Sequence, residues 1–195
     1  MKIKSYFGNK EILTNHVNKE SVIRYYLLFL PPKGSASILN IGCGRTDPYG
    51  GMLRTRTRNY KTLDIRNSAI VDYCLDISKE TLEEKFEWGT CFETIEHIPP
   101  EDKENAVLNI MMVCKNCVFT YPSKDFEMKD KDGNVINSFY HDPGHSEVKI
   151  NWEELFGETH NIEDKSTKNG RCIIILKDKN YRQKNIIKNR GYFEK

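Results

Sequence analysis

The sequence predicts an α/β fold, a three-layer α-β-α sandwich built around a mostly parallel seven-stranded sheet. Three observations carry this prediction. Short apolar runs alternate with helical patterns through residue 121, which is the order expected of parallel strands joined by helices. The first of these runs enters a tight Gly-x-Gly turn at Gly42 and Gly44. Near the end of the chain, Asn169-Gly170 precedes a strongly apolar run, which predicts an antiparallel C-terminal hairpin.

The individual elements follow from apolar periodicity and from capping and breaking residues. Strands are expected at residues 36–41, 60–65, 69–77, 86–92, 116–121, 160–165 and 171–177. Helices are expected at residues 18–30, at 78–85 behind a Ser78 cap, from Pro99-Pro100 onward, and at 152–156. The third of these helices carries the apolar stripe Val107, Leu108, Met111, Met112 and Cys114.

Composition bounds the class of protein. The 195 residues are 38% hydrophobic and 30% charged, a soluble balance with enough chain for one domain. No apolar run approaches the about 20 residues that span a bilayer, and Met1 is not followed by the apolar core of a signal peptide. We therefore expect a cytoplasmic protein with no membrane partner.

Residues 1–178 are expected to form a single domain, and residues 179–195 a basic tail. The tail carries six basic residues and one acidic residue, a net charge of +5, whereas the whole chain has only +2. Such a tail is a candidate contact for nucleic acid. Within the domain, residues 123–149 form a long polar insertion, and a stretch of this length in a compact domain usually has a function. We expect it to act as a lid.

Two acidic residues follow the glycine turn, one at the end of each of the next two predicted strands. Asp64 follows Gly42 by 22 residues at the end of the second predicted strand, the position from which an acid binds ribose hydroxyls in nucleotide-binding α/β folds. Asp76 stands at the end of the third predicted strand. Thr46 and Asp47 occupy the place of a third glycine, so a pyrophosphate-binding turn is incomplete. A nucleoside ligand without phosphate fits better than NAD.

Residues 38–122 resemble the class I S-adenosylmethionine-dependent methyltransferases. Residues 38–44 resemble the glycine-rich first motif of that family, residues 71–76 its third-strand segment, residues 86–98 its run ending in Glu-His-Ile, and residues 118–122 its fifth strand. Gly144-His145 ahead of Trp152 resembles the small-molecule and glycan methyltransferases.

The resemblance implies S-adenosylmethionine as cofactor and methyl transfer as the activity. Carried over position by position, it assigns cofactor binding to Asn40, Gly42, Cys43, Gly44, Asp64, Ile65, Asp76, Ile77 and Phe92. Asn40 departs from the family, which commonly has an acid there.

An oxygen or nitrogen acceptor also needs a base near its proton. Glu93, His141 and His145 are the candidate catalytic residues, whereas Glu96 and His97 are assigned to support of the following helix. The single Cys-x-x-Cys, Cys114 to Cys117, has no second ligand pair, so no metal site is predicted.

The acceptor is predicted mainly by exclusion. The chain has no Asp/Asn-Pro-Pro-Tyr after the fourth strand and no Pro-Cys nucleophile, which argues against methylation of DNA bases. A small molecule or a glycan is the expected acceptor. Two alternatives stay open: methylation of RNA held by the basic tail, and a non-catalytic binding protein with the same fold.

Overall fold

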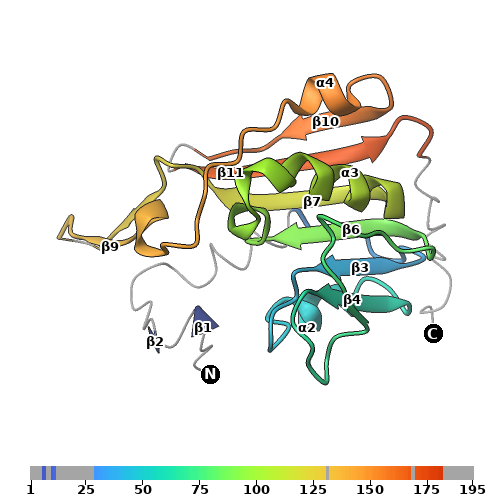
Figure 1. Cartoon of the computed structure of the whole chain (residues 1–195), viewed down its shortest axis with the longest axis horizontal. Helices are drawn as coiled ribbons and strands as arrows, with labels where there is room; N and C mark the ends of the chain where they lie inside the picture. The colour runs from blue at the N-terminus through green and yellow to red at the C-terminus, as the bar shows by residue number, and fades with distance from the viewer. Residues whose placement is uncertain (1–5, 8–9, 12–28, 131, 168–169, 182–195) are drawn as a thin grey trace, which may run out of the picture.

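The structure is a computed structural model that describes residues 6–7, 10–11, 29–130, 132–167 and 170–181 (Figure 1). The predicted helix at 18–30, apart from its last two residues, lies outside the described residues. So does Asn169 of the predicted hairpin turn, and the basic tail beyond residue 181.

A seven-stranded sheet forms the centre of the molecule, with strand order β10-β11-β7-β6-β3-β4-β5. Its strands are β3 (Ile38–Ile41), β4 (Tyr60–Asp64), β5 (Tyr73–Cys74), β6 (Phe86–Phe92), β7 (Cys114–Pro122), β10 (His160–Asp164) and β11 (Arg171–Asp178). Neighbours from β7 to β5 run parallel, and β11 runs antiparallel to both β7 and β10. The predicted fold class is confirmed, including the C-terminal hairpin.

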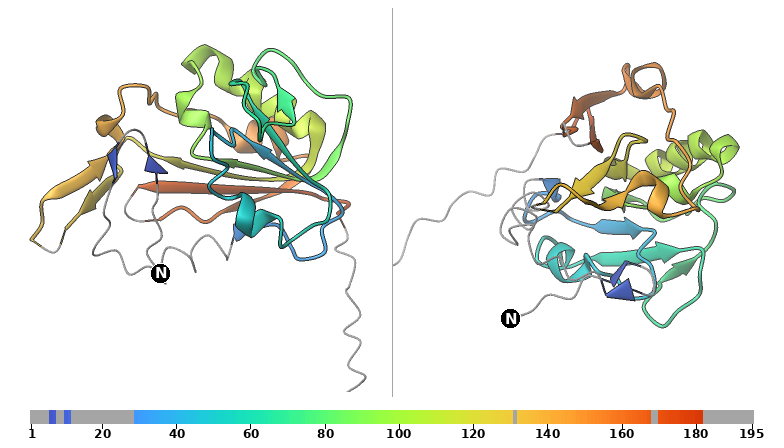
Figure 2. Two further views of the ribbon diagram at one scale, coloured as in Figure 1. Left: turned by 90° about the horizontal axis from the view of Figure 1, so that it is seen from below. Right: turned by 90° about the vertical axis from the view of Figure 1, so that its left-hand side faces the viewer.

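Helical segments lie on both faces of the sheet (Figure 2). The helical segments are α2 (Gly50–Leu53), η1 (Ile95–His97), η2 (Pro100–Asp102), α3 (Lys103–Val113) and α4 (Trp152–Phe156). One core joins α3 and α4 to Leu39, Ile41 and Phe119, and a second packs α2 against Ile38 and Trp88. Consecutive residues of β3 thus face opposite cores, which explains why its sequence is apolar throughout rather than alternating.

The predicted apolar stripe of α3 is wrong in two positions. The apolar residues buried under the helix are Ala106, Val107, Ile110 and Val113, which share one face at helical spacing. Met112 falls outside that face and is 60% exposed, and Cys114 is already the first residue of β7.

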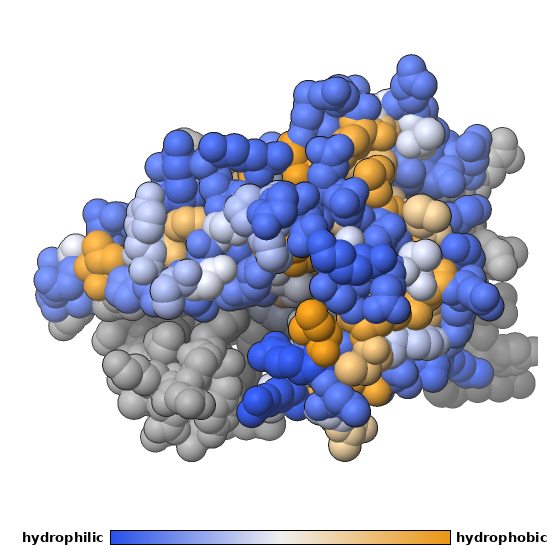
Figure 3. Space-filling view, in the orientation of Figure 1, coloured by the Kyte–Doolittle hydropathy of each residue, from blue (hydrophilic) through white to orange (hydrophobic). Residues whose placement is uncertain are grey.

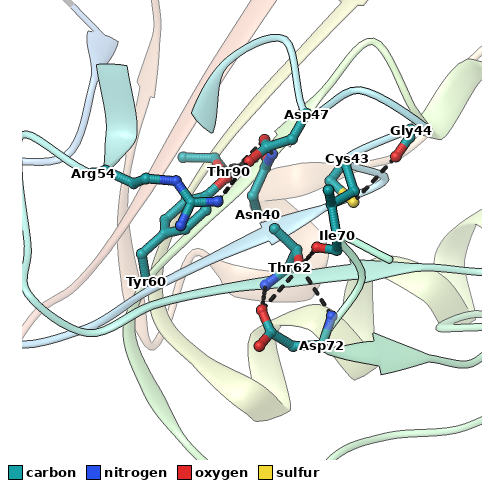
Figure 4. A network of polar contacts seen from close by, with 10 residues as sticks. All are labelled: Asn40, Cys43, Gly44, Asp47, Arg54, Tyr60, Thr62, Ile70, Asp72 and Thr90. Carbon is teal, nitrogen blue, oxygen red and sulfur yellow. Dashed lines mark hydrogen bonds and ion pairs between the residues drawn. The ribbon is translucent and has the colours of Figure 1, made fainter. Parts of the chain in front are cut away.

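The third strand is much shorter than the predicted 69–77. Side-chain hydrogen bonds replace the backbone hydrogen bonds that residues 69–72 would otherwise make with β4. The Asp72 carboxylate accepts from the Thr62 amide (2.9 Å), and the Asp72 amide donates to the Thr62 hydroxyl (3.0 Å) (Figure 4). Because these bonds turn the chain at residues 69–72, only Tyr73–Cys74 pair with β4.

The predicted helix at 78–85 does not form. The buried Ser78 hydroxyl donates to the Asp76 carboxylate (2.7 Å), and the chain makes one turn in which the Lys79 and Glu80 amides bond to the Asp76 carbonyl. Leu82 then packs against the first core, which draws the chain out of the helical path.

The insertion at 123–149 contains regular structure that the sequence did not predict. A hairpin of β8 (Glu127–Lys129) and β9 (Val135–Ser138) extends from the end of the sheet, followed by η3 (Phe139–His141) (Figure 1). A further short pair, β1 (Tyr6–Phe7) and β2 (Lys10–Glu11), lies near the N-terminus.

Hydrophilic residues cover most of the face shown in Figure 3, with hydrophobic residues interspersed among them. In the described part of the chain, no helix combines the length and the apolar character needed to cross a membrane.

Candidate functional site

The glycine turn leaves the carboxyl end of β3 with two residues in the left-handed region, Gly42 (φ +68°) and Gly44 (φ +66°). The Gly42 amide donates to the Leu63 carbonyl of β4 (2.8 Å), which anchors the turn. A Cβ at Gly42 would come within 2.2 Å of the Thr94 hydroxyl oxygen, so the close approach of these segments requires glycine. A Cβ at Gly44 would meet no atom of the described residues within 4 Å, so space is open on that side of the turn.

Asp64 joins the end of β4 to this turn. Its Oδ2 accepts a hydrogen bond from the Gly44 amide (2.8 Å), and its Oδ1 accepts from the Arg66 amide (2.9 Å) and from Arg66 Nε (3.2 Å). The carboxylate is only 3% exposed, whereas the Arg66 side chain is largely in solvent.

Asn40 belongs to a buried polar network that sequence reasoning missed (Figure 4). Its Oδ1 accepts from the Thr90 hydroxyl (3.0 Å), and its Nδ2 donates to Asp47 Oδ1 (2.9 Å). The Tyr60 hydroxyl donates to the same Asp47 oxygen (2.8 Å), and Arg54 pairs with Oδ2 (3.2 Å). The carboxylate that the family resemblance places at position 40 is therefore absent, but a carboxylate contacts Asn40 from position 47.

The sequence indicated the role of Asp47 only indirectly, because Thr46 and Asp47 occupy the place of the third glycine of a pyrophosphate-binding turn. Its backbone adopts φ +45°, a conformation that Asp tolerates better than most residues, and this turns the carboxylate inward. At Gly50, a Cβ would lie 1.9 Å from Asp47 Oδ2, so glycine is needed there to make room.

The network fixes the protonation of its neighbours. Burial, together with the hydrogen bond to Asp47, raises the pKa of Tyr60, so its hydroxyl remains a donor. Burial, and then the charges of Asp64 and Asp47, raise the pKa of Cys43 to about 11. Cys43 therefore stays a neutral thiol inside the turn.

The remaining predicted cofactor residues fall into two groups. Ile65 is 63% exposed at the end of β4, and Asp76 is half-buried one strand further along. By contrast, the side chains of Phe92 and Ile77 are buried: Phe92 packs edge-on against Tyr49 with ring centroids 5.0 Å apart, and Ile77 lies in the first core.

At the carboxyl end of β6, Glu93 adopts φ +51° and is held from two sides. Its carboxylate accepts from the Thr120 hydroxyl (3.0 Å) and pairs with Arg171 of β11 (2.5 Å). The Arg171 guanidinium also lies over the Phe126 ring, 4.8 Å from its centroid. Glu93 thus links β6 to the start of the insertion.

His145 and His97 come together, although 48 positions separate them, with ring centroids 4.7 Å apart. Burial, and then His145, lower the pKa of His97. Glu96, beside His97 on η1, is buried, and burial followed by the charge of Glu93 raises its pKa. The third predicted catalytic residue, His141, is exposed, with Nδ1 2.9 Å from the Ser138 hydroxyl, and does not belong to this cluster.

Comparison with solved structures identifies the fold. The N-methyltransferase NodS from Bradyrhizobium japonicum, solved with S-adenosyl-L-homocysteine, aligns with a TM-score of 0.56 at 13% identity over 82% of this chain and 86% of that chain. The DhpI–SAH complex aligns with a TM-score of 0.56 at 12% identity over 86% and 88%. The small RNA methyltransferase HEN1 aligns with a TM-score of 0.58 at 13% identity over 94% of this chain and 27% of that chain.

No protein-family model and no curated protein sequence matches the chain. The structural likeness shows that this chain has the fold of the class I methyltransferases.

The Asp47 network leads to a stability prediction. Asp47→Ala removes the acceptor for Asn40 and Tyr60 and puts alanine at a positive φ, so we expect a loss of about 2–4 kcal/mol in the free energy of unfolding. Asp47→Asn keeps an acceptor oxygen and tolerates the same φ, and should cost about 1 kcal/mol or less. Urea unfolding of both variants measures the difference, and a loss below about 0.5 kcal/mol for Asp47→Ala would refute the role of the network.

Proposed function

We propose that the protein is an S-adenosylmethionine-dependent methyltransferase that methylates an oxygen or nitrogen of a small-molecule or glycan acceptor. The observation that carries the proposal is the hydrogen bond between the Gly44 amide and the Asp64 carboxylate. It places a glycine turn and an acid at the adjacent carboxyl ends of β3 and β4, where open α/β sheets bind nucleoside-like ligands.

The cofactor is proposed to lie across these strand ends. Gly42 and Gly44 approach its amino acid portion, since glycine leaves the backbone accessible there. Asp64 accepts hydrogen bonds from the ribose hydroxyls in place of those from Arg66. Exposed Ile65 directly follows β4, and half-buried Asp76 lies two residues beyond the end of β5, where the adenine would be reached next.

Methyl transfer breaks the bond between sulfonium sulfur and methyl carbon while the acceptor's lone pair forms a new bond to that carbon. S-adenosylhomocysteine leaves, and the acceptor's proton passes to a base. Among the predicted catalytic residues, His145 has suitable geometry: its Nδ1 lies 2.9 Å from the Phe139 carbonyl, which can only accept, so the neutral ring presents Nε2 as an acceptor. Glu93 is a weaker candidate because Arg171 and Thr120 already engage its carboxylate.

The proposal of a small-molecule or glycan acceptor rests on the insertion at residues 123–149. In this proposal residues 123–149 close over the acceptor as a lid of the domain spanning residues 1–178. Tyr140, next to η3's Phe139, is 76% exposed and offers an aromatic surface that a sugar or a planar small molecule could contact. RNA is the second candidate acceptor, favoured by the basic charge of residues 179–195 and by the fold shared with HEN1.

Cofactor binding tests the proposal first. Isothermal titration calorimetry should show one S-adenosylhomocysteine per chain, and Asp64→Asn should weaken binding at least about tenfold, because a charged acceptor for the ribose is lost. Asp130→Asn, a change in the exposed turn between β8 and β9, is the matched control and should leave affinity unchanged. Absence of binding by the folded wild-type chain would refute the proposal.

Transfer of a labelled methyl group then separates the acceptors. We expect label on glycans or small molecules at a rate that varies little with ionic strength. An RNA acceptor would instead show activity that falls steeply with salt and drops on removal of residues 182–195, since phosphate contacts depend on counterion release. That second pattern would replace the small-molecule proposal by RNA methylation.

A further inference from the structure

We propose that Glu96, His97 and His145 form a binding site for a divalent transition-metal ion. One carboxylate oxygen and one nitrogen from each ring lie within 4.8 Å of one another. Ligand atoms around a tetrahedral ion with bonds of about 2.1 Å are roughly 3.4 Å apart, so small side-chain rotations complete the geometry. Two imidazoles and a carboxylate suit zinc, cobalt, manganese or iron(II), rather than the all-oxygen sites of calcium.

The surroundings of the Glu96 carboxylate favour a bound cation. The residue is 1% exposed, and its Oε2 is buried with no hydrogen-bond partner among the described residues. A buried carboxylate oxygen left without a donor or a positive charge is costly. The buried Lys103 ammonium donates its hydrogen bond to the Ile95 carbonyl (2.6 Å), so its charge acts on Glu96 through space and not through a direct contact with Oε2.

The two histidines are available as ligands. The Phe139 carbonyl, 2.9 Å from His145 Nδ1, places the proton on that nitrogen and leaves the Nε2 lone pair free to bind a metal. Neither ring nitrogen of His97 has a hydrogen-bond partner within the part of the chain that the structure describes. Asp142 Oδ2 lies 3.8 Å from His145 Nε2 on a half-exposed side chain, close enough to contribute directly or through a water.

The backbone holds the ligands in place without the ion. Glu96 and His97 are consecutive residues of η1, and the insertion is fastened to them by Ser146, whose amide donates to the Glu96 carbonyl (2.8 Å) and whose hydroxyl donates to the Ile98 carbonyl (3.1 Å). This brings His145 beside η1, so the site needs little reorganisation to bind an ion.

The site lies close to the glycine turn. Thr94, two residues before Glu96, contacts Gly42 so tightly that no Cβ fits between them. If the proposed methyltransferase function holds, an ion here would bind the acceptor's oxygen and lower its pKa, and His145 would serve as a ligand rather than as the base. That role rests on the proposed function, whereas binding of the ion does not.

The test uses the full chain, stripped with a chelator and titrated with Co²⁺ in the absence of any cofactor. We expect one Co²⁺ per chain, seen by calorimetry and by visible absorption of the bound ion. Glu96→Gln and His145→Ala should each weaken binding at least about 100-fold, because each removes a ligand. His141→Ala is the matched control: it removes an exposed histidine of the same insertion and should leave affinity unchanged.

Circular dichroism establishes that each variant is folded, and His97→Gln provides a third ligand variant should His145→Ala unfold. The proposal is overturned if the wild-type chain binds no Co²⁺ at millimolar concentration. It is also overturned if Glu96→Gln binds as tightly as wild type, or if His141→Ala loses as much affinity as His145→Ala. No cofactor is present in this titration, so a failure to bind Co²⁺ leaves the methyltransferase proposal unaffected. In the same way, a failure to bind S-adenosylhomocysteine leaves the metal-site proposal unaffected.

Discussion

The hydrogen bond from the Gly44 amide to the Asp64 carboxylate is the interaction on which the candidate site depends. It is possible only because β3 and β4 are parallel neighbours that end together, and because Gly44 can adopt a positive φ. The bond fixes the distance between a turn open to a ligand and an acid that can bind hydroxyls. The Asp47 network supports the same turn from beneath, and Thr94 brings η1 and its acidic and histidine side chains alongside it.

The sequence predicted those parts of the fold that local pattern determines. The strands at 86–92 and 171–177 and the helix at 152–156 are observed within one residue of the predicted bounds, since short segments rich in apolar residues mark them. The predictions of a strand at 69–77 and a helix at 78–85 were wrong because side-chain hydrogen bonds replace the backbone hydrogen bonds of these elements. Asp72 bonds to Thr62, and Ser78 bonds to Asp76. The Asp72–Thr62 contact joins residues ten positions apart, which no local pattern predicts. Ser78 and Asp76 are near neighbours, and here the serine side chain closes a single turn instead of capping a longer helix.

The candidate site, like the fold, could be predicted from the sequence only in part. The glycine turn and Asp64 follow from motif and spacing, whereas the contacts that modify them do not. No local pattern places the Asp47 carboxylate on Asn40, the Arg66 side chain on Asp64, or Arg171 on Glu93. The meeting of His145 with Glu96 and His97 likewise depends on the path of the insertion, so sequence reasoning assigned the two η1 residues to helix support and predicted no metal site.

The central claim, that a nucleoside cofactor binds across the ends of β3 and β4, is tested most directly by mapping the backbone amide resonances of the chain during titration with S-adenosylhomocysteine. We expect shifts concentrated at residues 42–45 and 64–66, with the Gly44 amide among the largest because its partner, Asp64, gains a new ligand. Shifts that spare these residues, or no shifts at saturating ligand, would contradict it.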